Sequence, residues 1–363
     1  MFDLVWQPYV LSLGGSLPVI GSFVSVWTIV SNGLQFITGE ICDAKGRKLT
    51  IQGFYMASII GFISILAARD WVWLLPGVFL FSIADSLAEP GFNPLFAESV
   101  DVKKIGLAFS LMGLTWSLPG LYSKLLAGYL GQNVSIRTTL WLILLGEILG
   151  LLIFQFTVKE TLVDKRRLDF GAVYRNVISV FKPDKEFKNF YILASLDRFA
   201  WELNRGIFVA MIYKSFNFSL IQIGILMTVT MASTTIALVP TGSLVDKYGS
   251  TKFLQGSEVL AIMSFVGCIF VKSFPLFIVI QVLRGLAMAL WDPAYYSLIA
   301  KTFDENERGT IYGKINGLKG LITFPAPILG AFLYSTYGFG ATFSFSVAVS
   351  LMALLFTFKI KTE

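Results

Sequence analysis

One apolar stretch, which reads DRFAWELNRG, holds the densest group of side chains that could do chemistry. Arg198, Glu202 and Arg205 stand at i, i+4 and i+7, so a helix places them on one stripe where the glutamate can pair with either arginine. Asp197 and Trp201 fall on a neighbouring stripe. Carboxyl groups beside cations in an apolar setting can load and release protons, and arginines bind anionic or hydroxylated solutes. The stretch therefore predicts a polar site for a small-molecule substrate, with protons as a second ligand.

Three further ionisable residues, Asp85, Arg284 and Lys319, lie inside other apolar runs. A charge at the centre of a membrane helix costs about 2.5–3.5 kcal/mol on insertion scales, so each is a functional candidate by default. The alternative is a structural network of ion pairs that locks the helices together, with Trp201 serving only in packing. Both interpretations remain open at this point.

Enzyme chemistry finds no support in the residue types. The chain has no histidine, and it contains no P-loop, no G-x-G-x-x-G and no G-x-S-x-G motif. Its two cysteines, Cys42 and Cys268, form no C-x-x-C pair. We therefore expect no enzyme activity, no cofactor, no metal and no nucleic-acid partner.

The elements that must position these residues are membrane helices. The chain of 363 residues is 55% hydrophobic and 14% charged, with a mean hydropathy of +0.71, whereas soluble domains average about 25% charged residues. A helix needs about 20 mostly apolar residues to cross a bilayer. Such runs are found, after a short apolar piece at 1–13, at 19–40, 49–68, 71–92, 106–130, 138–158, 189–213, 219–241, 251–271, 274–297, 309–334 and 338–358.

The connectors between these runs differ in charge. On one side the basic residues are few: Arg69, Arg137, Lys214 and Lys272. The other side carries most of the lysines and arginines, including those of 159–188. Basic loops stay in the cytoplasm, so we expect a multi-pass protein of the plasma membrane with both termini cytoplasmic.

The connector at 159–188 is polar but not featureless. Phe170, Val173, Tyr174 and Val177 follow helical spacing, and Pro183 marks an end. This spacing predicts an amphipathic helix, which either lies on the inner membrane surface or packs beneath the membrane bundle.

The sequence also repeats itself. After a shift of 203 residues, Glu89-Pro90 meets Asp292-Pro293 and Gln52-Gly53 meets Gln255-Gly256. The same shift aligns two polar hairpins, pairing Gly39, Asp43 and Gly46 with Gly242, Asp246 and Gly249. The chain is therefore interpreted as two parallel copies of a six-helix unit, a known transporter design.

These features resemble the major facilitator superfamily, whose signature after the second helix is G-x-x-x-D-(R/K)-x-G-(R/K)-(R/K). Gly39, Asp43, Gly46, Arg47 and Lys48 match it, and the second hairpin keeps the glycines and the aspartate. The resemblance implies an all-α membrane protein of twelve helices. Its parts are a first bundle at 1–158, a cytoplasmic linker at 159–188 and a second bundle at 189–363.

The resemblance further implies secondary active transport by alternating access, with the first, fourth, seventh and tenth helices lining the cavity. We expect a proton-coupled transporter of a small organic solute; the alternative is a membrane sensor or scaffold that moves nothing. The hairpins are expected to latch the cytoplasmic ends, with Asp43 near the start of a facing helix. The basic residues Arg47 and Lys48 could instead only fix topology or contact anionic lipid.

The first repeat unit is shorter at its start than the second. Under the shift of 203, Met1 corresponds to Asn204, so residues 190–203 have no counterpart in the first unit. We expect that the first helix is incomplete in this form; a naturally short first helix is the alternative.

Overall fold

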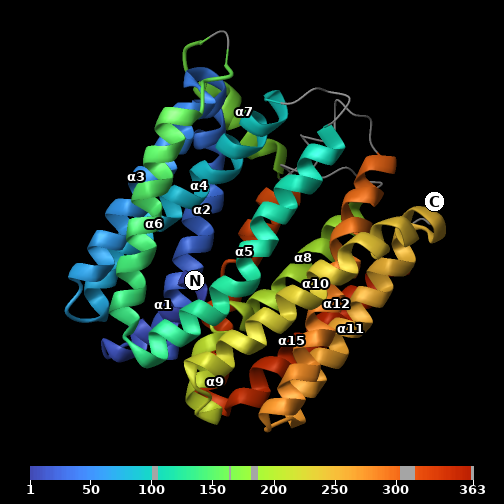
Figure 1. Ribbon diagram of the computed structural model, residues 1–363. Helices are drawn as coiled ribbons and strands as arrows, with labels where there is room; N and C mark the ends of the chain where they lie inside the picture. The colour runs from blue at the N-terminus through green and yellow to red at the C-terminus, as the bar shows by residue number, and fades with distance from the viewer. Residues whose placement is uncertain (100–104, 163–164, 181–186, 303–314, 361–363) are drawn as a thin grey trace.

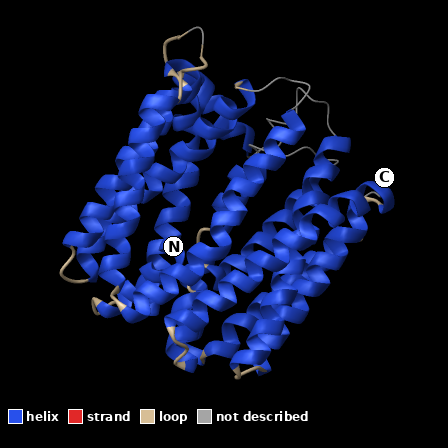
Figure 2. Cartoon of the chain, viewed as in Figure 1, coloured by secondary structure: helices blue, strands red, loops and turns tan. Residues whose placement is uncertain are grey.

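The computed structural model describes the chain except for residues 100–104, 163–164, 181–186, 303–314 and 361–363 (Figure 1). Every regular element of the described part is a helix (Figure 2). The first half holds α1 Phe2–Ser12, α2 Leu17–Lys45, α3 Arg47–Ala67, the 3-10 turn η1 Trp71–Leu74, α4 Leu75–Glu98, α5 Ile105–Asn133 and α6 Ile136–Thr157. The rest are α7 Phe170–Val180, α8 Lys188–Arg205, α9 Phe208–Phe216, α10 Leu220–Tyr248, α11 Ser250–Phe270, α12 Phe274–Thr302, α14 Ala326–Tyr337 and α15 Phe339–Thr357.

Local sequence explains where the long helices begin and end. Ser219 and Gln222 form a reciprocal capping box at the start of α10. Gly46 and Gly249, which the repeat superimposes, both end one helix and begin the next with positive φ values of 127° and 87°. Glycine adopts this conformation without the steric penalty that a Cβ would bring. The two hairpins thus share a backbone conformation as well as a sequence pattern.

The helices gather into two groups. In the first group α4 packs against α2 and α3, and in the second α11 and α12 pack together while α15 packs against α8 and α11. Figure 1 shows the first group on the left and the second on the right. The most extensive contacts between the groups are those of α5 with α10 and of α2 with α14, and α1 also contacts α9 and α10.

The contacts between the groups lie toward one end of these helix pairs. A Cβ added to Gly128 of α5 would lie 2.5 Å from the Leu220 carbonyl oxygen of α10, and one added to Gly21 of α2 would lie 2.6 Å from the Pro327 carbonyl oxygen. Small residues allow this close approach of helix backbones. Toward the other end, which carries α7, a Cβ added to Gly242 would have no neighbour within 4 Å among the described residues.

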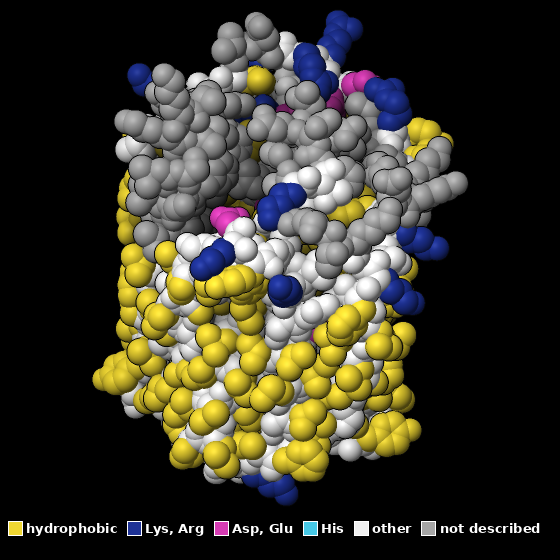
Figure 3. All heavy atoms as spheres, turned by 90° about the vertical axis from the view of Figure 1, so that its right-hand side faces the viewer, with side chains coloured by type: hydrophobic (Ala, Val, Ile, Leu, Met, Phe, Trp, Pro, Cys, Tyr) yellow, Lys and Arg dark blue, Asp and Glu magenta, His cyan; other side chains and the backbone are white. Residues whose placement is uncertain are grey.

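The surface is that of a membrane protein. Nine helical stretches of the described residues are long and apolar enough to span a bilayer, and large apolar side chains such as Phe156 (84% exposed) stand outward. In Figure 3, hydrophobic side chains cover the lower part of the molecule, and lysines and arginines gather toward the α7 end. The prediction of an all-α, multi-pass membrane protein is confirmed.

Two predicted runs are interrupted. The run 189–213 is divided into α8 and α9 at Gly206 and Ile207. Gln7 of α1 fills the break: its side-chain amide donates to the Gly206 carbonyl at 2.9 Å and accepts from the Ala210 backbone N–H at 2.8 Å. The run 309–334 is helical at 315–323 and turns before α14, where Pro325 cannot continue the backbone hydrogen bonding.

Candidate functional site

The predicted acid–arginine stripe forms on α8. Glu202 Oε1 lies 2.9 Å from Arg198 Nη2 and 3.8 Å from Arg205 Nη1. The glutamate side chain is 9% exposed, whereas those of the arginines are 48% and 55% exposed. The acid is therefore enclosed between two cations whose side chains are about half exposed.

Arg284 and Trp201 also meet, but inside the second group. The guanidinium lies 4.8 Å from the Trp201 ring centroid and 4.7 Å from that of Phe208, and Nη2 donates to Asn204 Oδ1 at 3.0 Å. Arg284 is 5% exposed. Aromatic faces and an amide oxygen hold this buried cation, so its environment is that of a packed interior.

Asp197, Lys319 and Asp292 form a second ionic group. Lys319 lies close enough to both carboxylates for an electrostatic interaction, and its Nζ lies 4.8 Å from the ring centroid of Tyr295. Asp197 is 8% exposed. The group connects α8, α12 and the helical segment 315–323.

Asp85 lies in the first group, apart from the α8 stripe. Its Oδ2 accepts a hydrogen bond of 2.5 Å from Trp27 Nε1, which ties α4 to α2. One turn farther along α4, Glu89 accepts from Gln35 Nε2 at 2.7 Å. Both acids face α2 and are held by neutral donors.

The sequence reasoning missed three ionisable residues. Asp3 of α1 forms an ion pair with Lys124 of α5 and also interacts with Arg205 of α8. Glu258 of α11 is 0% exposed. Lys124 and Glu258 lie in predicted membrane runs, so the rule that selected Asp85 and Lys319 would have selected them too, whereas Asp3 lies in the short piece 1–13.

Asp3, Lys124, Arg205 and Asp292 form the central polar face, a set of charged side chains within electrostatic range of one another. Asp3 and Lys124 belong to the first group and Arg205 and Asp292 to the second, and the charge of Arg205 acts on both acids. A set of opposite charges on both groups can hold a polar solute between them.

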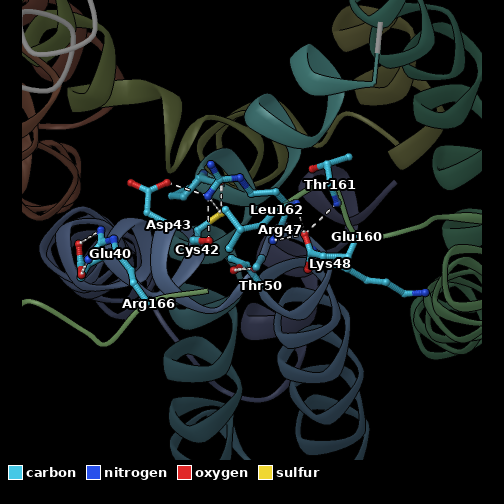
Figure 4. A network of polar contacts seen from close by, with 12 residues as sticks. Glu40, Cys42, Asp43, Arg47, Lys48, Thr50, Glu160, Thr161, Leu162 and Arg166 are labelled. Atoms are coloured by element: carbon cyan, nitrogen blue, oxygen red, sulfur yellow. Dashed lines mark hydrogen bonds and ion pairs between the residues drawn. The ribbon is translucent and has the colours of Figure 1, made fainter. Parts of the chain in front are cut away.

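The first polar hairpin is tightly bonded to its own half (Figure 4). Asp43 Oδ1 lies 2.7 Å from Arg47 Nη1. Glu160, just beyond α6, accepts from the backbone N–H of Arg47 at 2.9 Å and of Lys48 at 3.2 Å. A carboxylate at the first turn of α3 satisfies free N–H groups and complements the helix dipole.

The linker adds a second clamp on this hairpin. Arg166 donates to both carboxylate oxygens of Glu40, at 2.5 and 2.8 Å, and Glu40 also accepts from the Asp169 backbone N–H at 2.7 Å. The hydrogen bonds and charge of Glu40 raise the pKa of Arg166. Behind this clamp α7 packs on α2, with Phe170 and Tyr174 exposed by 68% and 67%.

Asp43 is expected from the sequence to help latch the two halves together. In the described structure its carboxylate pairs with Arg47 of the same hairpin. The role of the hairpins as a latch of the cytoplasmic ends stays a prediction. In the second hairpin, Asp246 is exposed and Lys247 Nζ lies 5.1 Å from the Tyr248 ring centroid.

Known proteins resemble this chain along nearly its whole length. It is 23% identical to "Multidrug resistance protein MdtG" of Proteus mirabilis (strain HI4320) over 347 residues, which is 92% of this chain and 85% of the relative. A protein of the same name from Dickeya zeae (strain Ech586) is 21% identical over 86% of this chain and 77% of its own length.

Solved transporter structures share the fold. A bacterial homolog of the human lysosomal transporter Spinster, in an inward-facing and unoccupied conformation, gives a TM-score of 0.82 at 13% identity, covering 99% of this chain and 92% of its own. The nucleoside transporter NupG gives 0.80 at 14% identity, covering 99% and 95%. At such identities the likeness concerns the fold alone. The family model described as Major Facilitator Superfamily matches residues 1–188 and 190–363, so the chain belongs to this superfamily, whose members are transporters and not enzymes.

Proposed function

We propose that the protein is a secondary active transporter that moves a small organic solute by alternating access, coupled to protons. The observation that carries the proposal is the central polar face, where the ion pair of Asp3 and Lys124 in one group lies within electrostatic range of Arg205 in the other. A solute bound between the two groups senses their relative position, which is the requirement for alternating access.

We further propose that the α7 end faces the cytoplasm of a cell whose plasma membrane holds the protein. The lysines and arginines that gather at this end support that orientation. Because the groups touch at the opposite end, through Gly128 and Gly21, the described conformation is then inward-open, and the C-terminus is cytoplasmic.

The solute is expected to carry an anionic or hydroxylated group as well as an apolar part. Arg198 and Arg205 keep half-exposed guanidinium groups, which suit such oxygens. The relatives named as multidrug resistance proteins support a chemically broad panel for the first screen, with export as well as uptake measured.

Flux into and out of proteoliposomes, with and without an imposed pH gradient, tests the proposal. We expect saturable flux of at least one solute that rises with the gradient and falls in Arg205→Gln. Arg137→Gln is the matched control, because Arg137 donates to the Leu66 carbonyl at 2.7 Å and lies away from the polar face. No flux for any solute in either direction would favour a sensor or scaffold that moves nothing.

A further inference from the structure

Glu258 of α11 is a buried acid that the central polar face does not use. Its side chain is 0% exposed, and among the described residues no donor makes a hydrogen bond of good geometry with either carboxylate oxygen. An ionised carboxylate is strongly disfavoured in an apolar interior unless donors or a cation compensate it. Glu258 therefore has the properties of a group that binds a proton or another small cation.

Two polar groups from other helices adjoin this carboxyl group. Asp197 of α8 and Ser350 of α15 both lie within interaction distance of Glu258. Ser350 is 0% exposed and Asp197 is 8% exposed. Three helices thus bring polar side chains together in the interior. Within the described part of the chain, the oxygens of Glu258 and Ser350 have no hydrogen bond of good geometry, although buried polar groups are almost always paired.

Of the described cations, Lys319 and Arg198 act on Asp197. Asp197 interacts with Lys319 of the 315–323 segment and with its neighbour Arg198, and Asp292 of α12 faces the same lysine. Arg284, also on α12, donates instead to Asn204 at 3.0 Å. Asp197 consequently has the cations Lys319 and Arg198 on one side and the carboxyl group of Glu258 on the other.

We propose that Glu258 and Asp197 share one exchangeable proton, with Ser350 as their hydrogen-bonding neighbour, and that this pair is the proton-coupling site of the transporter. Two adjacent carboxyl groups hold one proton between them because two like charges cannot both be accommodated. The proton comes from water at the polar face, forms an O–H bond on one carboxylate, and returns to water when that bond breaks. Lys319 beside Asp197 disfavours a metal cation at the same place.

The coupling part of this inference rests on the proposed transport, whereas the shared proton does not. Infrared difference spectra of the purified protein between low and high pH test the shared proton directly. We expect Glu258→Gln and Asp197→Asn each to remove or shift the same carbonyl band of a protonated acid. Glu147→Gln is the matched control, because Glu147 lies on α6 of the first half and has an unpartnered oxygen of its own. It should leave that band in place.

Two results would overturn the shared proton. One is that Glu258→Gln leaves every carbonyl band unchanged. The other is that sodium ions at constant pH remove the band, which would make the pair a sodium site. Ser350→Ala supplies a second variant of nearly unchanged volume if a carboxyl variant does not fold, and it should shift the same band.

Flux measurements test the coupling. For a solute found in the panel, Glu258→Gln should lower pH-gradient-driven flux about tenfold more than it lowers solute counterflow, since only the first needs a titrating group. Equal losses in both would overturn the coupling role. If the unaltered protein shows no counterflow with any solute, the transport proposal fails, and the infrared result still decides whether the proton is shared.

Discussion

At the scale of single residues, Arg284 is a buried charge whose contacts with aromatic rings stabilise the second group of helices. Its guanidinium lies 4.8, 4.7 and 5.7 Å from the ring centroids of Trp201, Phe208 and Phe265. A lysine keeps the charge but loses the planar group that stacks on aromatic faces. We expect Arg284→Lys to lower the free energy of unfolding by about 1–2 kcal/mol, seen as a lower Tm in detergent.

Arg205→Lys provides the control for that substitution. The Arg205 side chain is 55% exposed and lies 3.8 Å from Glu202, so an ammonium can replace its guanidinium at little cost to stability. Equal Tm losses in the two variants would contradict the role given to the aromatic contacts of Arg284.

Glu160 carries a second prediction at this scale. Its carboxylate accepts from the backbone N–H groups of Arg47 and Lys48 at the start of α3, and from those of Thr161 and Leu162. Glu160→Gln removes the charge and one acceptor oxygen. We expect the free energy of unfolding to fall by about 1 kcal/mol, measured by thermal unfolding beside Asp246→Asn, which alters an exposed acid of the second hairpin. A loss no larger than that of Asp246→Asn would show that the cap does not stabilise α3.

The sequence foretold single residues better than their partners. Intramembrane charge identified Asp197, Glu202 and Lys319, and helical spacing alone paired Glu202 with Arg198 and Arg205. The sequence could not pair Glu258 with Asp197, because the proximity of these two side chains depends on how α8, α11 and α15 pack.

At the scale of elements, the break between α8 and α9 depends on a residue 199 positions away. Gln7 donates to the Gly206 carbonyl and accepts from the Ala210 N–H, and it is 3% exposed. Its replacement by leucine leaves both backbone groups buried without partners, at about 1–3 kcal/mol each. We expect Gln7→Leu to lower Tm by several degrees, and Gln35→Leu, which loses one exposed bond to Glu89, to lower it less. Equal losses would mean that the break needs no such support.

The same break marks a limit of sequence reading. Apolar run length predicted one helix at 189–213, because a single glycine does not by itself end a helix. The interruption becomes favourable only where Gln7 supplies the missing partners, and nothing local to 206–210 reports that.

At the scale of the whole molecule, the repeat was the most informative signal. A shift of 203 residues placed Gly46 over Gly249 before any geometry was known, and both adopt positive φ between two helices. The conformational state could not be foretold, since the sequence must be compatible with every state of the transport cycle. The contacts of α5 with α10 and of α2 with α14 show which end of the molecule is closed.

That closed end gives a prediction about the transport cycle. Gly120 of α5 contacts Met231 of α10, and alternating access requires such contacts to separate. In a background without the buried Cys42 and Cys268, we expect a Gly120→Cys, Met231→Cys pair to form a disulfide that stops flux, with activity restored by a reductant. The control pair is Gly120→Cys with Leu238→Cys, which stands two helical turns, about 10 Å, farther along α10. It should cross-link poorly. A disulfide between positions 120 and 231 that leaves flux unchanged would mean that α5 and α10 stay together throughout transport. The polar face between the two groups would then have to open by another motion.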